Sequence, residues 1–221
     1  MQRPLHHGPI SRRAALTGGL SVFLCAPSAE AAVQPARLAF VALRNGHKIG
    51  EQHMTFGRDD GLTVRTETDL AVKLGPIQLY SYRHEATERW RDDRFQSLDT
   101  QTMDNGKAMK VSARREGEAV TISPASGGAL QAPPDALPFT HWNRRIAKSP
   151  LFNPQDGKLL HETVTAAAGS TIILADGSIR RAQGVAFRGA ATIEDWYDDD
   201  DVWIGLTGRL KDGSILEYRR L

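Results

Sequence analysis

Turn-forming residues recur about every ten to fifteen positions along most of this 221-residue chain. Glycine, asparagine and aspartate tolerate the positive φ that tight hairpins need, and short connections between strands require antiparallel pairing. This spacing leaves room for strands of ordinary length and predicts a succession of β-hairpins. The turns stand at Asn45-Gly46, Asp59-Asp60-Gly61, Asp92-Asp93, Asp104-Asn105-Gly106, Glu116-Gly117, Gly127-Gly128, Asp156-Gly157, Asp176-Gly177, Asp198 to Asp201 and Asp212-Gly213.

Apolar and polar residues alternate between these turns. Leu62, Val64 and Leu70 share one face of an extended segment, while Arg65 and Glu67 share the other. The same period of two recurs in most of the later segments. About a dozen such strands in one flat sheet would be unusual, so the sheet should curl. The sequence therefore predicts an all-β fold, a single antiparallel meander of about a dozen strands curled into a barrel or half-barrel.

One segment interrupts this pattern. The proline-rich run 133–138 stops strand pairing, and residues 139–147 are predicted to form a short helix with Phe139, Trp142 and Ile146 on one face. We expect this helix to cover an opening or an edge of the curved sheet. It would divide the chain into an earlier and a later run of strands.

Residues 1–31 are predicted to be an export signal that is cleaved. Arg12 and Arg13 precede a short apolar stretch diluted by glycine, and Ala29-Glu30-Ala31 has the small residues of a cleavage site. The paired arginines favour export by the twin-arginine machinery, with a Sec leader as the alternative. The stretch is shorter than the roughly 20 apolar residues that span a bilayer, so no stable transmembrane anchor is expected. The expected location is the periplasm, with residues 32–221 forming a single β-rich domain.

Removal of the signal changes the charge of the chain. The full chain has 28 Lys and Arg against 26 Asp and Glu, and cleavage after Ala31 leaves equal numbers. A balanced charge gives no electrostatic support for a nucleic-acid partner. Cys25, the single cysteine, is lost with the signal. The chain also lacks G-x-S-x-G, a P-loop, a dinucleotide-binding glycine motif and H-E-x-x-H, so no cofactor is expected and an enzyme is disfavoured.

The best candidates for ligand binding lie on the one element that is not a strand. Phe139, His141, Trp142 and Asn143 gather there, and a rigid scaffold often presents its site on such a segment. Tyr82 is a further candidate on a strand face that it shares with His84, Ala86, Glu88 and Trp90. The alternative is structural: Trp142 would plug the mouth of the barrel while Arg144 and Arg145 face water.

No metal site is predicted. His84 and Glu88 are four residues apart, which on a strand is about 13 Å and too far for one ion. The four aspartates 198–201 lack the spaced carboxylates and the glycine of a calcium loop, and they are better explained as a hydrated hairpin tip. Trp196 and Trp203, which flank that tip, are predicted to be cross-strand neighbours.

Four groups of residues stand out as motifs: Leu43-Arg44-Asn45-Gly46 with Ile49-Gly50, Tyr82-Arg83-His84 with Glu88-Arg89-Trp90, Thr140-His141-Trp142-Asn143, and Asp195-Trp196-Tyr197-Asp198 with Trp203-Ile204-Gly205-Leu206. Together they resemble a family of uncharacterised exported proteins of Gram-negative bacteria, classed under a domain of unknown function. The resemblance covers nearly the whole mature chain and implies export and the domain boundary, but no catalytic residue. More distantly, a curved antiparallel sheet with a covering helix is similar to the lipoprotein-carrier folds of the periplasm.

These observations lead to one leading hypothesis and two alternatives. The first is a non-catalytic periplasmic protein that binds an apolar ligand, such as a lipid, or a lipid-modified partner under the 139–147 segment. The second is a periplasmic hydrolase that uses His141 with an acid such as Asp195 or Glu194. The third is an envelope interaction or assembly protein with a filled core and no ligand pocket.

Overall fold

The computed structural model describes residues 35–190 and 192–221. The predicted export signal, with Arg12, Arg13 and Cys25, lies outside the described residues. Within the described part of the chain the structure has eighteen strands and one short 3-10 helix. No helix in that part is long and apolar enough to cross a membrane.

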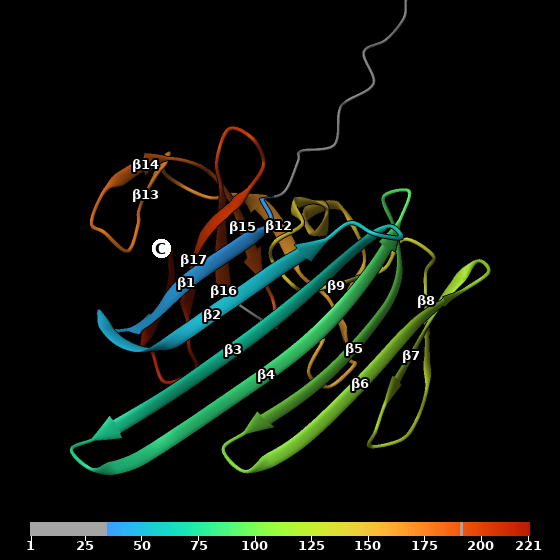
Figure 1. The fold of residues 1–221 in the computed structure, drawn as a ribbon, viewed down its shortest axis with the longest axis horizontal. Helices are drawn as coiled ribbons and strands as arrows, with labels where there is room; N and C mark the ends of the chain where they lie inside the picture. The colour runs from blue at the N-terminus through green and yellow to red at the C-terminus, as the bar shows by residue number, and fades with distance from the viewer. Residues whose placement is uncertain (1–34, 191) are drawn as a thin grey trace, which may run out of the picture. The chain divides into compact units, whose positions relative to one another are not determined.

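Thirteen strands form one large sheet (Figure 1). They are β1 (Arg37–Arg44), β2 (His47–Gly57), β3 (Leu62–Leu74), β4 (Ile77–Arg91), β5 (Arg94–Asp104), β6 (Lys107–Glu116), β7 (Ala119–Pro124), β8 (Leu130–Ala132), β12 (Thr163–Ala166), β15 (Gln183–Arg188), β16 (Thr192–Tyr197), β17 (Trp203–Arg209) and β18 (Ile215–Arg220). Their spatial order is β12-β15-β16-β17-β18-β1-β2-β3-β4-β5-β6-β7-β8.

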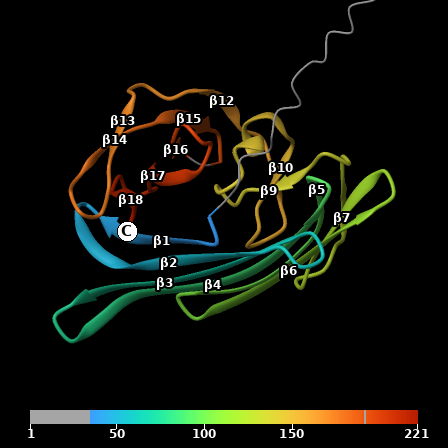
Figure 2. The same ribbon diagram turned by 45° about the horizontal axis from the view of Figure 1, so that its top comes forward.

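The sheet consists of two antiparallel meanders that meet in its middle. β1 pairs with β18, with Phe40 opposite Arg220, so the first and last strands are neighbours. β1–β8 then continue to one edge, and β18–β15 with β12 continue to the other. The edge strands β8 and β12 stand at opposite ends of this order, and Figure 2 shows the long strands as a curved layer. The predicted all-β class and the curled antiparallel sheet are confirmed, and the sheet is curled without being closed.

Five short strands lie outside this sheet. β9 (Leu137–Pro138), β10 (Leu151–Phe152) and β11 (Leu159–Leu160) form a small sheet in which β9 and β10 are parallel. β13 (Thr171–Ile173) and β14 (Ile179–Arg181) form a separate hairpin. The small β9–β11 sheet falls in the segment between β8 and β12, so the predicted division into an earlier and a later run of strands is confirmed.

The helical element is shorter than predicted and begins later. It is the five-residue 3-10 helix η1 (Arg144–Lys148), capped by the side chain of Asn143, so residues 139–143 are not helical. Two local features explain the difference. The amide of Phe139 donates to the carbonyl of Phe152 in β10, and His141 has φ of 65°, which a right-handed helix excludes.

Strand β4 illustrates how the sequence builds the core. His84, Ala86, Glu88 and Trp90 are buried on one face, and the intervening residues are exposed or half-buried. Neighbouring strands add side chains to the same inner face. The 133–160 segment covers this face with its own buried side chains, Phe139, Trp142, Ile146, Leu151 and Phe152. Burying each large side chain stabilises the fold by about 1.5–3 kcal/mol, so this segment is an integral part of the core.

The predicted pairing of Trp196 with Trp203 is wrong. Trp203 lies opposite Tyr197, and Trp196 lies opposite Gly205, because the register of β16 and β17 shifts between Trp196 and Tyr197. Trp203 therefore packs in the main core on Phe40. Trp196 packs on the other face of the sheet with Ala182 and Ile204.

Candidate functional site

A buried carboxyl group lies at the centre of the covered inner face. Glu88 has no exposed surface, and its two oxygens each accept a hydrogen bond from an indole. Trp142 Nε1 donates to Oε1 at 3.0 Å, and Trp90 Nε1 donates to Oε2 at 3.0 Å. The two indole rings meet edge to face with centroids 5.5 Å apart. Trp90 comes from β4 itself, whereas Trp142 comes from the covering segment, so Glu88 ties that segment to the sheet.

Burial determines the protonation of this group. Loss of solvation raises the pKa of Glu88 to about 7, and the hydrogen bonds from Trp142 and Trp90 only partly offset that rise. The carboxyl therefore changes charge near neutral pH. The carboxyl is fully buried among aromatic rings, so we assign it to the core of the fold and not to a solvent-accessible site.

A second buried carboxyl group lies beside His141. Asp195 on β16 is fully buried, and its Oδ2 is 2.9 Å from Nδ1 of His141. Its Oδ1 accepts a hydrogen bond from Trp203 Nε1 at 3.1 Å. Burial raises the pKa of Asp195 above its ordinary value, and the contacts with His141 and Trp203 oppose that rise. The structure thus brings together the histidine and one of the two acids that the sequence suggested.

The backbone and the aromatic neighbours fix the position of His141. Its carbonyl accepts a hydrogen bond from the hydroxyl of Tyr197 at 2.7 Å. Its ring stacks on Trp203 with centroids 5.6 Å apart and an interplanar angle of 20°, and it also contacts Phe139. The side chain is 20% exposed. When Asp195 accepts from Nδ1–H, Nε2 is the basic ring nitrogen. Among the hydrogen bonds of residues 35–190 and 192–221, none joins Nε2 to a serine or threonine hydroxyl.

The other predicted site residues have mainly structural contacts. Phe139 is buried against Phe187, with ring centroids 4.9 Å apart. Asn143 uses its side-chain oxygen to accept from the amide of Arg145, which starts η1. Arg144 pairs with Asp201 and donates to Gln183, and Arg145 donates to the carbonyl of Asp93. The buried Trp142 agrees with the structural alternative for this segment, although both arginines have partners.

Tyr82 is not part of this group. It lies six residues before Glu88 on β4, which corresponds to about 20 Å along the strand. It contacts His84 in a stacked arrangement, with centroids 6.2 Å apart. His84 in turn hydrogen-bonds the Thr102 hydroxyl through Nδ1 at 2.8 Å. Burial lowers the pKa of His84 to about 4, so the ring is neutral at physiological pH.

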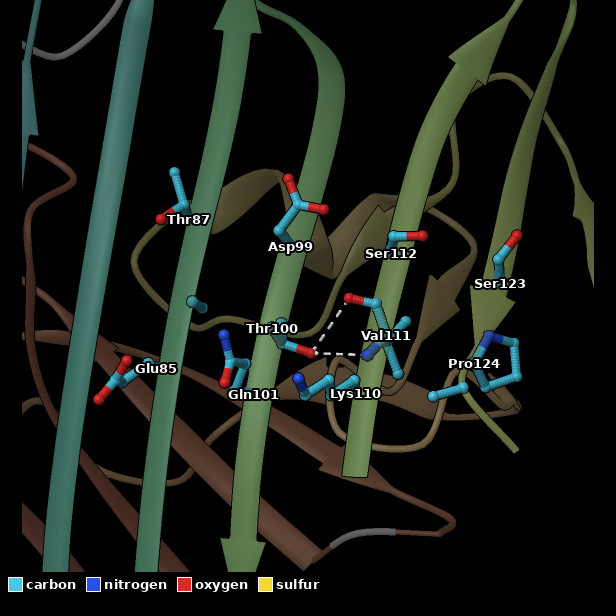
Figure 3. Close-up of a pocket in the computed structure, with 12 residues that line it drawn as sticks. Glu85, Thr87, Asp99, Thr100, Gln101, Lys110, Val111, Ser112, Ser123 and Pro124 are labelled. Carbon is cyan, nitrogen blue, oxygen red and sulfur yellow. Dashed lines mark hydrogen bonds between the residues drawn. The ribbon is translucent and has the colours of Figure 1, made fainter. Parts of the chain in front are cut away.

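A shallow groove lies on the opposite face of β4–β7 (Figure 3). Glu85, Thr87, Asp99 and Ser112 line it with polar side chains. Thr100, which belongs to the inner face, bonds its hydroxyl to the backbone of Val111 there. No group of three or more His, Cys, Asp or Glu suited to a metal ion occurs among the described residues. Nothing in this groove meets the His141 or Glu88 clusters.

The fold defines a class of protein: an all-β chain with one strongly curved, open sheet whose inner face is covered by its own central segment. Residues 40–221 match the profile of a domain of unknown function, DUF6134. The chain belongs to the DUF6134 family. This agrees with the uncharacterised family that the sequence motifs resemble.

A solved structure has a similar fold. It is a β-barrel-like protein of the domain of unknown function DUF1849 from Brucella abortus, 12% identical in sequence, with a TM-score of 0.59. The match covers 84% of this chain and 95% of that chain. At this identity the likeness shows the fold alone. Comparison with curated proteins finds no match.

Proposed function

We propose that this protein is a non-catalytic binding protein, exported to the periplasm, that contacts a lipid or a lipid-modified partner. The contact lies at the tip of the β3–β4 hairpin. One observation carries the proposal: Ile77 and Leu79 at that tip are 60% and 56% exposed. Exposure of large apolar side chains to water is unfavourable in free energy, so an exposed pair at a projecting tip favours a contact with another apolar surface.

The geometry of the hairpin supports this proposal. β3 and β4, with 13 and 15 residues, are the longest strands in the described part of the chain (Figure 1). Their turn, Gly75-Pro76, joins Leu74 to the paired Ile77. The neighbouring hairpins turn through Asn45-Gly46 and Asn105-Gly106, which are polar. Met103, beside the Asn105-Gly106 turn, is also 44% exposed, so the apolar surface at this end is largest on the β3–β4 tip and extends to the next hairpin.

The covered inner face argues for a surface contact over an enclosed ligand. Phe139 and Trp142, the central candidates for a ligand site, are 8% and 3% exposed and pack on aromatic neighbours. A ligand beneath residues 139–147 would have to displace them and break the Trp142–Glu88 hydrogen bond. An exposed hairpin needs no such rearrangement.

A lipopeptide tests this proposal. We would measure binding of a fluorescent diacylated peptide and of the same peptide without its acyl chains to the wild-type protein. The matched control is Leu130→Ser, which removes an exposed apolar side chain on the edge strand β8. We expect binding of the acylated peptide only, a loss of at least tenfold in Ile77→Ser/Leu79→Ser, and no change in Leu130→Ser. Equal affinity of the hairpin variant and the wild type would refute the proposal.

The contact between His141 and Asp195 favours a second candidate, a hydrolase. A carboxylate that orients an imidazole is half of a general-base arrangement, and the fifth of the His141 side chain that is exposed would meet the substrate. A screen of ester and amide substrates tests it, with His141→Ala as the comparison. Turnover that His141→Ala abolishes while the fold is kept would establish catalysis. Equal background rates would remove this candidate.

A further inference from the structure

The two ends of the large sheet carry opposite charge. In the antiparallel order, the turns after β1, β3, β5 and β17 lie at one end, which we call the basic end. Residues 43–48, 73–78, 103–108 and 209–214 form these four turns and their flanks. They contain six Lys and Arg, namely Arg44, Lys48, Lys73, Lys107, Arg209 and Lys211, against Asp104 and Asp212.

The turns at the other end are acidic. They follow β2, β4, β6 and β16 and comprise residues 58–61, 91–94, 115–118 and 198–201, which we call the acidic end. These residues contain ten Asp and Glu against four arginines. Arg144, Arg145 and Arg220 also reach this end, and the ten acids still outnumber the resulting seven bases. Residues 32–221 contain equal numbers of basic and acidic residues. The two signs of charge are therefore separated between the two ends of the strands.

The apolar tip lies at the basic end. Ile77 and Leu79 follow the β3–β4 turn, and Lys73 precedes it on the other strand. Beside this hairpin, the turns after β1 and β17 border an open groove of about 760 Å³. Arg44, His47, Lys48 and Lys73 line it, and Asp212 is its one carboxylate. Arg44 pairs with Asp212 and Lys48 pairs with Glu51, so a phosphate would compete with these two carboxylates. A groove of this composition suits an anionic group such as a phosphate.

We propose that the basic end docks on an anionic phospholipid bilayer, with Ile77 and Leu79 inserted among the acyl chains and the surrounding lysines facing the phosphates. This inference rests on the proposed function and names its partner. Insertion of apolar side chains and attraction of basic ones act together at a membrane surface. Each lysine near an anionic surface contributes about a fivefold gain in binding.

The distribution of charge favours a bilayer over a single lipid-modified protein. The basic side chains are spread over four separate turns, and Lys48, Lys73, Lys107 and Lys211 are all exposed. A planar array of phosphates meets several such turns at once, whereas one acyl anchor would meet the hairpin alone. The acidic end would be repelled, so the strands would stand with the β3–β4 turn towards the membrane.

Vesicle sedimentation tests the inference. The mature wild-type protein would be mixed with phosphatidylcholine vesicles and with vesicles containing about one third phosphatidylglycerol, at low and at physiological salt. Lys73→Glu/Lys107→Glu reverses the charge of two side chains at the basic end. The matched control, Arg58→Glu/Arg94→Glu, makes the same change at the acidic end. Thermal melts verify that every variant folds.

We expect at least tenfold stronger binding to the anionic vesicles, weakening with salt. Lys73→Glu/Lys107→Glu and Ile77→Ser/Leu79→Ser should each lose at least tenfold, and Arg58→Glu/Arg94→Glu should lose less than twofold. Equal binding to both vesicle types, or equal losses in the two charge variants, overturns the inference. If the hairpin still binds the acylated peptide in that case, the partner is a lipid-modified protein and the proposed function stands. If the hairpin variant matches the wild type in both assays, both proposals fail.

Discussion

The buried carboxyl of Glu88 makes the stability of the protein depend on pH in a predictable direction. Its pKa is raised to about 7 in the folded state, against an ordinary value of 4.5. The folded state therefore binds the proton more tightly than the unfolded state. The stabilisation from this group is fully present below about pH 4.5 and is lost as the pH rises through 7. Glu88→Gln removes this dependence.

The size of the effect follows from the two pKa values. Between pH 5 and pH 8, Glu88 should lower the free energy of unfolding by about 2.5 kcal/mol. Glutamine cannot accept from both Trp90 and Trp142, so the variant also carries a pH-independent penalty of about 1–3 kcal/mol. Glu88→Gln should therefore be less stable than the wild type at pH 5, and it should regain about 2.5 kcal/mol relative to it by pH 8.

Urea unfolding followed by tryptophan fluorescence measures this difference, because Trp90 and Trp142 contact the group. The difference between variant and wild type is the informative quantity, since other titrating groups cancel in it. Glu85→Gln is the matched control, as Glu85 lies on the same strand but is exposed. Parallel pH curves for the wild type and Glu88→Gln would mean that folding does not raise the pKa of Glu88.

Three further predictions test other parts of the structure. Burial lowers the pKa of His84 to about 4, so the wild type should lose about 2 kcal/mol of stability between pH 8 and pH 5 through this group, and His84→Gln should abolish that loss in the same urea assay. Gly50→Ala would place a Cβ 1.9 Å from the carbonyl oxygen of Asp69 and should destabilise by more than about 2 kcal/mol in a thermal melt, whereas Gly57→Ala, with its nearest atom at 4.0 Å, should be nearly neutral. Asp195→Asn leaves one of two donors without a carboxylate acceptor and should cost about 1–3 kcal/mol in urea, while Asp199→Asn at the exposed tip should cost less than about 0.5 kcal/mol.

Much of the large sheet could be predicted because its signals are local. The turn at Asn105-Gly106 and the alternation along β4 each depend on neighbours in the sequence. The covering segment could not be predicted in the same way. Its β9 strand pairs with β10, across η1, and the positive φ of His141 ends any helix that starts at Phe139. The β9–β10 pairing and the backbone conformation at His141 form only in the folded chain. The helical spacing of apolar residues in this segment does not predict them.

The candidate site was partly accessible to sequence reasoning. The pairing of His141 with an acid was one of the alternatives, and the structure places Asp195 at that position. The sequence does not predict the environment of Glu88: it places this residue on the strand face of Tyr82 and weighs it only as a metal ligand, a role that the spacing from His84 rejects. A carboxylate on the apolar face of a strand, two residues before Trp90, was the available signal. Its second indole, Trp142, lies 54 residues away and could be found only in the folded chain.

Amide hydrogen exchange of residues 32–221, with and without vesicles containing phosphatidylglycerol, locates the surface that contacts the lipid. The proposed contact lies on the outside of the fold, at the β3–β4 tip, so residues 72–80 should become protected while the exchange of residues 137–152 stays unchanged. Faster exchange in residues 137–152, with no protection at the hairpin, would mean that the covering segment opens to admit a ligand. That result would refute a lipid contact at the β3–β4 tip.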